Sequence, residues 1–116
     1  MSTLEVSNLN DGTTTVATTF VTNGSAKVWA RVDQSGQTLQ DSYNVSSITD
    51  GGTGFTSLNL TSAFSSANWC VNVCANSVSD NSHAGDASTV RGGAMNSSGT
   101  RGDASRFHMS AHGDLA

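Results

Sequence analysis

The sequence predicts an all-β fold, specifically an antiparallel β-sandwich of the jelly-roll type, and three observations predict it. Apolar and polar residues alternate along several short runs, which is the period of a half-buried strand. Clusters of glycine, asparagine and aspartate separate these runs at near-regular intervals, as turns do. No run keeps a helical period, so we expect no helix longer than a single turn.

The first expected strands precede residue 50. Residues 14–21 are rich in β-branched side chains, which favour strands, and Asn23-Gly24 predicts a hairpin turn after them. Residues 26–33 alternate, so that Val28 and Val32 face one side of a sheet while Trp29 and Arg31 face the other. A turn is expected at 34–37, and another strand at 41–48.

The following elements continue the pattern. A glycine-rich turn at 50–54 leads into a strand at 55–61, and a connector at 63–68 places Phe64 in the core. The next strand is expected at 69–75, and the last at 104–112. The predicted core consists of Val28, Val32, Val45, Ile48, Leu58, Leu60, Phe64, Val71 and Val73.

The predicted organisation is an N-terminal arm or docking segment at residues 1–12 and a single β-sandwich domain at 13–116. Within that domain, residues 76–102 are almost entirely asparagine, serine, glycine, aspartate and threonine. They predict a long polar loop region, with one short strand near 88–91. We expect this loop to bind a receptor, to pack against a neighbouring subunit, or to serve as a solvated connector. Its candidate residues are Arg91, Met95, Asn96, Arg101 and Asp103.

The composition indicates that part of the surface is buried against other chains. Only 35% of the residues are hydrophobic and 12% are charged, so the core is thin and the surface is polar but uncharged. Association into a homo-oligomer is one way for such a chain to become stable. The net charge of −4 and the five scattered cations argue against a nucleic-acid partner. No apolar run has the length for membrane insertion, and the start does not resemble a signal peptide.

No catalytic, metal or cofactor site is expected from the sequence. Cys70 and Cys74 lie in one expected strand, ~13 Å apart, which is too far for a disulfide, so we expect them to be reduced and half-buried. His108 and His112 have the same spacing and cannot share one ion unless symmetry joins several copies. Nothing in the sequence places a base beside either thiol. The 80–86 loop has oxygen ligands for calcium but lacks the EF-hand pattern.

Three stretches of the chain resemble a module of tailed-bacteriophage virion proteins. They are N-G-S-A-K-V-W at 23–29, D-S-Y-N-V-S-S-I-T-D-G-G-T-G at 41–54 and A-N-W at 67–69. The module is frequent at the C-terminal tips of tail fibres and in small structural proteins of these phages. The resemblance covers roughly residues 13–75.

The resemblance implies a β-sandwich, usually trimeric, that is displayed on the virion and has no enzyme activity. The first hypothesis is a fibre-tip-like attachment protein that binds a host surface glycan or protein. The alternative is a head decoration, collar or tail adaptor protein with a purely structural role. A glycan-cleaving enzyme is disfavoured because no pair of carboxylates stands out. Residues 1–12 are too few for a shaft, so we expect a small standalone component, assembled in the host cytoplasm, whose arm docks onto other virion proteins.

Overall fold

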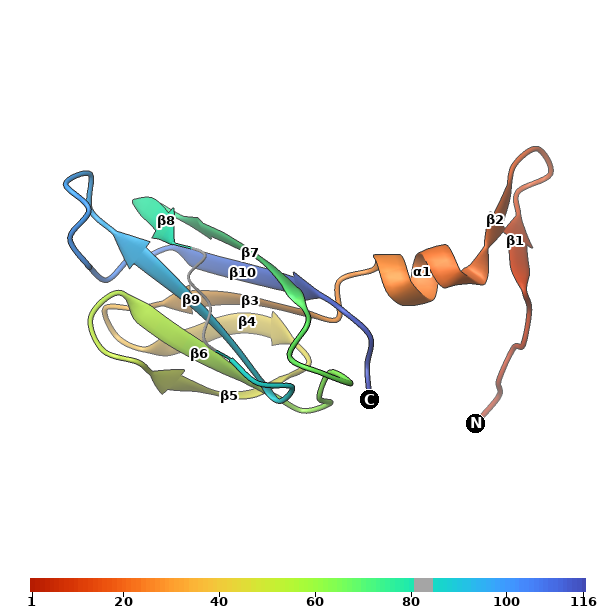
Figure 1. The fold of residues 1–116 in the computed structure, drawn as a ribbon, viewed down its shortest axis with the longest axis horizontal. Helices are drawn as coiled ribbons and strands as arrows, with labels where there is room; N and C mark the ends of the chain where they lie inside the picture. The colour runs from red at the N-terminus through yellow and green to blue at the C-terminus, as the bar shows by residue number, and fades with distance from the viewer. Residues whose placement is uncertain (81–84) are drawn as a thin grey trace.

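A computed structural model describes residues 1–80 and 85–116 of the chain. Strands make up 49% of the structure and the described residues contain one short helix, so the all-β prediction is confirmed. Eight of the strands form two four-stranded antiparallel sheets, and the N-terminal residues form a separate arm (Figure 1). We call residues 26–116 the body and residues 1–25 the arm.

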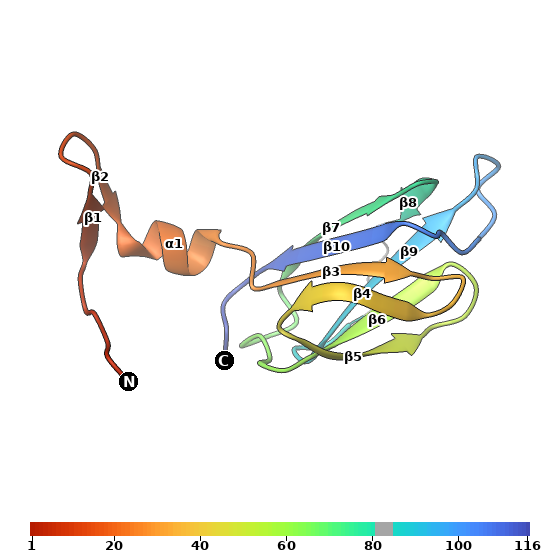
Figure 2. The same cartoon turned by 180° about the vertical axis from the view of Figure 1, so that it is seen from behind.

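The two sheets of the body lie face to face, as Figures 1 and 2 show from opposite sides. The first sheet has the strand order β4 (Thr38–Tyr43), β3 (Val28–Asp33), β10 (Phe107–His112) and β7 (Cys70–Ala75). The second sheet has the order β5 (Val45–Asp50), β6 (Phe55–Leu60), β9 (Thr89–Met95) and β8 (Val78–Asp80). All neighbouring strands are antiparallel.

The hydrophobic core lies between these sheets. Of the nine predicted core residues, four are buried and the other five are partly buried against the core. The buried four are Val28, Val32, Leu58 and Phe64. The sequence analysis missed further buried apolar residues, which are Trp69, Val90, Ala94, Ala104, Phe107, Met109 and Ala111, with the small Ala30 between Val28 and Val32.

The strand predicted at residues 14–21 is wrong over most of its length. Only Thr15–Ala17 forms a strand, β2, which pairs with the short β1 (Asn8–Asn10), and the chain then enters helix α1 (Thr18–Gly24). Strand preference depends on a neighbouring strand, and among residues 1–80 and 85–116 this segment pairs only with β1. Local hydrogen bonds form instead; for example, Thr22 Oγ1 donates to the Thr18 carbonyl at 3.2 Å. The helix therefore exceeds the single turn that we expected, and Asn23-Gly24 ends it rather than forming a hairpin.

The long loop region predicted at residues 76–102 is also wrong in part. It contains β8 and the seven-residue β9, which pairs with β6 on one side and β8 on the other. Glycines suggested a loop here, but Gly92 lies in β9, close to side chains of the first sheet. A Cβ added to Gly92 would lie 2.7 Å from Met109 Sδ and 2.8 Å from Val73 Cγ2 of the first sheet. Glycine in a strand commonly marks such a close approach.

Asn44 forms the corner at which the chain passes from the first sheet to the second. Its φ of +59° is in the left-handed region, which asparagine tolerates better than most residues. Its side-chain Nδ2 donates to the carbonyls of Lys27 at 3.0 Å and Ser62 at 2.9 Å, and its Oδ1 accepts from the Ser62 N–H at 2.7 Å. The corner between the two sheets therefore explains why asparagine occupies position 44 of the 41–54 motif.

The arm extends away from the body along the long axis of the molecule, whose extents are 50 × 28 × 24 Å (Figure 1). Its hairpin and helix occupy residues 8–24, beyond the predicted arm of residues 1–12. No residue of α1 is buried. The large apolar side chains exposed on the arm are Met1, Leu4, Val6, Leu9, Val16, Phe20 and Val21.

Candidate functional site

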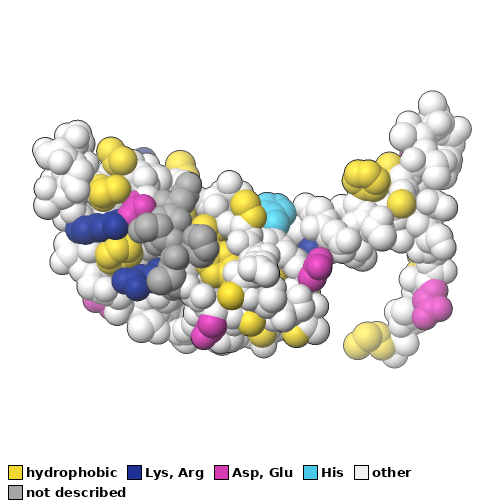
Figure 3. Space-filling model, in the orientation of Figure 1, with side chains coloured by type: hydrophobic (Ala, Val, Ile, Leu, Met, Phe, Trp, Pro, Cys, Tyr) yellow, Lys and Arg dark blue, Asp and Glu magenta, His cyan; other side chains and the backbone are white. Residues whose placement is uncertain are grey.

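The predicted recognition residues lie at the end of the body opposite the arm. Arg91 projects from β9, whereas Arg101 follows the turn after that strand. Their guanidinium carbons lie 4.2 Å and 4.0 Å from the centroid of the Phe55 ring, within the range of cation–π attraction. Figure 3 shows two basic patches at this end, beside an acidic and an apolar patch.

Both arginines make contacts within the chain. Arg101 forms an ion pair with Asp80 at the end of β8, and only 33% and 14% of the two side chains is exposed. Arg91 Nη2 lies 3.4 Å from the Gly51 carbonyl oxygen, a weak hydrogen bond to the turn between β5 and β6. The structure therefore brings the two arginines together around Phe55, where they hold neighbouring turns and strands in place.

Asp103 stabilises the same end of the body. Its Oδ1 accepts a hydrogen bond from the Gly54 N–H at 2.7 Å, and the Gly54 carbonyl accepts one from the Ala94 N–H at 2.7 Å. Gly54 has a φ of +73°, and an added Cβ would lie 2.5 Å from the Ala94 carbonyl oxygen. This explains glycine at the end of the 41–54 motif, because no other residue fits the turn.

The remaining two predicted residues belong to the hairpin beyond β9. Asn96 Oδ1 accepts hydrogen bonds from the Ser98 N–H at 2.9 Å and the Thr100 N–H at 3.0 Å, which closes the turn. Met95 pairs with Val78 of β8 and forms an isolated bridge with Arg101. The five predicted residues thus share one end of the body, where they form hydrogen bonds, ring contacts or strand pairs with neighbouring segments.

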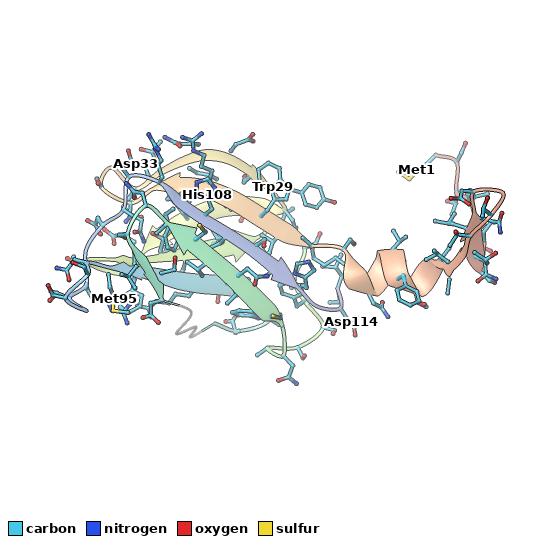
Figure 4. All side chains as sticks on the ribbon, turned by 90° about the horizontal axis from the view of Figure 1, so that it is seen from above. Met1, Trp29, Asp33, Met95, His108 and Asp114 are labelled. Atoms are coloured by element: carbon cyan, nitrogen blue, oxygen red, sulfur yellow. The ribbon has the colours of Figure 1, made fainter. Side chains whose placement is uncertain are left out.

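A second candidate surface, which the sequence analysis did not identify as a site, is the outer face of the first sheet. An open groove of about 470 Å³ crosses its four strands. Trp29 of β3 lines it and pairs directly with Tyr43 of β4, and these residues are 42% and 60% exposed. Figure 4 labels Trp29 and His108 on this sheet. The polar side chains of the groove are Arg31, Asp41, Asn72, His108 and Ser110.

The cysteines lie on the same outer face, and they differ from the sequence analysis in two ways. Cys70 and Cys74 lie in a strand as predicted, but both are exposed and not half-buried. The register of β7 and β10 places His112 opposite Cys70 and His108 opposite Cys74. The sequence placed no base beside either thiol, whereas the register sets a histidine directly opposite each cysteine. Alternation put these residues on one face of each strand, but sequence alone did not give the pairing of two strands more than 30 residues apart.

The expected calcium loop at 80–86 lies partly outside the described residues. At its ends, Asp80 is paired with Arg101, and Asp86 accepts hydrogen bonds from the Ser88 N–H and hydroxyl, both at 2.7 Å. The Ser88 hydroxyl, followed by the Ser88 N–H and the Thr89 hydroxyl, holds the pKa of Asp86 below its ordinary value. Within residues 1–80 and 85–116, no group of three or more histidine, cysteine, aspartate or glutamate side chains is placed to hold one metal ion.

Comparisons of the chain with protein-family models, with curated proteins and with solved structures gave no match. Among the described residues, no helix has the length and apolar character to cross a membrane.

Proposed function

We propose that the chain is a non-enzymatic structural or attachment component of a tailed-bacteriophage particle, that its body is a β-sandwich, and that the full chain assembles as a trimer. The resemblance of residues 23–29, 41–54 and 67–69 to virion modules supports this proposal. The structure gives physical reasons for several residues of the central motif. Asn44 makes the corner between sheets, and Gly54 occupies a backbone position that requires glycine.

The observation that carries the proposal is the arm. A seven-residue helix is too short to be stable alone, and a single two-stranded hairpin is marginal in water. The N-cap residue of the helix, Ala17, has no side chain that bonds the first turn. Phe20 is 73% exposed and Leu4 81% exposed. An arm of this kind needs a partner surface, which copies of the same chain or other virion proteins would supply.

Attachment to a host is the first form of the proposal, with a surface glycan or protein as the partner. A head decoration, collar or tail adaptor role is the second form. One observation favours the second form: Arg91, Arg101, Asp103 and Asn96, which the sequence suggested for recognition, make internal hydrogen bonds, ring contacts or ion pairs. Their side chains support turns, so binding by this end of the body would rest on other groups.

Quantitative mass spectrometry of purified phage particles tests the proposal. The copy number of this chain is compared with that of the major capsid protein of the same particles. A few copies located at the tail, together with binding of the purified chain to host cells, support attachment. Tens to hundreds of copies on the head support decoration. Absence of the chain from infectious particles, after removal of loosely bound protein, would overturn both forms.

A further inference from the structure

The outer face of the first sheet carries an arrangement of metal-binding side chains that the proposed function does not use. Both cysteines of the chain and two of its three histidines lie on neighbouring strands β7 and β10. The register pairs Cys70 with His112 and Cys74 with His108. All four belong to the outward set of their strands, since Val71, Val73, Met109 and Ala111 between them pack in the core.

The geometry of an antiparallel pair suits a shared metal ion. Directly opposed residues have Cβ atoms ~4.5–5.5 Å apart and point to the same side of the sheet. A thiolate sulfur and an imidazole nitrogen bind zinc at ~2.3 Å and ~2.0 Å, so side chains from opposed positions have the reach to meet at one ion. Cys70, Cys74 and His108 are exposed, and His112 is partly exposed, so an ion reaches them from solvent.

We propose that each cysteine–histidine pair is a two-ligand site for a borderline-soft divalent metal ion such as zinc. Thiolate and imidazole together select this class of ion over magnesium or calcium. The ion displaces the thiol proton, which passes to solvent, and binds the neutral imidazole nitrogen. The other positions of each tetrahedral ion are taken by water. The two pairs are separated by ~13 Å along the strands, so each binds its own ion.

Between the two sites the same strands provide a matched control. Asn72 of β7 pairs with Ser110 of β10, in the row between the two cysteine–histidine pairs. This pair lies on the same two strands and in the same antiparallel register but has neither a thiol nor an imidazole. Metal binding through the proposed ligands should stay the same when Asn72 and Ser110 are changed. Nonspecific binding to the sheet surface should change.

Cobalt(II) titration of the full-length chain, under reducing and oxygen-free conditions, tests the proposal. We expect two cobalt ions per chain, a sulfur-to-cobalt charge-transfer band in the near ultraviolet, and loss of the band when zinc is added. Cys70→Ser and Cys74→Ser should each halve the intensity of the band. His112→Gln and His108→Gln should weaken binding at the corresponding site, whereas Asn72→Ser with Ser110→Ala should leave both sites intact. Circular dichroism checks that each variant keeps the β fold.

Two results would overturn the proposal. One is the absence of a charge-transfer band with excess cobalt. The other is a band of unchanged intensity and affinity in the double variant His108→Gln/His112→Gln, which would show that the thiols bind without the histidines. Neither result bears on the phage proposal, because metal binding is measured on the purified chain and particle composition on the virion.

Discussion

At the scale of single residues, Gln34 is the clearest case of a polar side chain that the fold requires. It lies in the turn after β3 and is only 1% exposed. Its Nε2 donates to Thr56 Oγ1 at 3.2 Å, and its Oε1 accepts from the Ala104 N–H at 2.9 Å. The backbone N–H of Gln34 also donates to the Ala104 carbonyl at 2.9 Å. This one side chain therefore connects the first sheet with β6 and with the segment before β10.

Gln34→Met should lower the free energy of unfolding by about 1–3 kcal/mol, because buried groups at Thr56 and Ala104 lose their partner. The measurement is urea denaturation followed by circular dichroism. Gln40→Met is the matched control, since Gln40 is exposed on β4, and it should change the stability by less than about 0.5 kcal/mol. Equal losses at the two positions would contradict a structural role for the buried amide.

Asp86 should titrate below the usual range of an aspartate, and Ser88 should be the main reason. The Ser88 hydroxyl is the largest of the groups that lower the pKa of Asp86. Since the folded pKa is lower than the unfolded one, the stabilisation is present above the unfolded pKa and is lost as the pH falls through the folded pKa. An NMR titration of the Asp86 carboxyl should show its midpoint rising in Ser88→Ala. An unchanged midpoint in that variant would show that the hydroxyl is not the cause.

At the scale of elements, β9 shows how glycine in a strand serves packing. Gly92→Ala should destabilise the body by about 1–3 kcal/mol, because the new methyl group would lie too close to side chains of the facing sheet, which must shift to make room. The nearest are Met109 at 2.7 Å and Val73 at 2.8 Å. Gly102→Ala is the control, since a Cβ there meets nothing within 4 Å. Thermal unfolding compares the two, and equal midpoints would contradict tight packing at Gly92.

The sequence predicted an element correctly where its local pattern determines the structure. It failed where distant segments of the chain determine the structure. The alternation of β3 put Val28 and Val32 in the core, and both are fully buried. In β9 the pattern was hidden, because Gly92 and Gly93 have no side chains to alternate. For α1, threonine and valine favoured a strand, but the segment has no further strand to pair with.

The candidate sites also differ in how far the local sequence could predict them. Local sequence was sufficient to place Arg91, Arg101 and Asp103 in one region of the chain, but not to show that both arginines lie over the ring of Phe55, the first residue of β6. The cysteine–histidine pairs depend on the register of β7 with β10, which joins residues 70–75 to 107–112. Register over such a separation is set by the tertiary packing of both strands, and single-strand alternation does not specify it.

At the scale of the whole molecule, the body and the arm have different relations to their surroundings. The body has its own core between two sheets, and its first backbone bond to β10, from the Lys27 N–H to the Ala111 carbonyl at 2.9 Å, comes just after the arm ends. The arm has no buried residue in its helix and exposes large apolar side chains. The body thus has the means to fold alone, whereas the helix of the arm has no buried residue that could hold it.

Deletion of residues 1–25 should therefore separate folding from assembly. We expect the shortened chain to keep the β-type circular dichroism spectrum and a cooperative unfolding transition, because the deletion leaves both sheets and the core intact. Light scattering should give the mass of one body, whereas the full chain should give three times its 11.9 kDa. The double variant Phe20→Ser/Val21→Ser changes two exposed apolar residues of the arm in the full-length chain. It should also lower the mass measured by light scattering, because it weakens the trimer. A shortened chain that remains trimeric would show that the faces of the body, and not the arm, hold the copies together; a full chain that is monomeric at micromolar concentration would contradict the trimer itself.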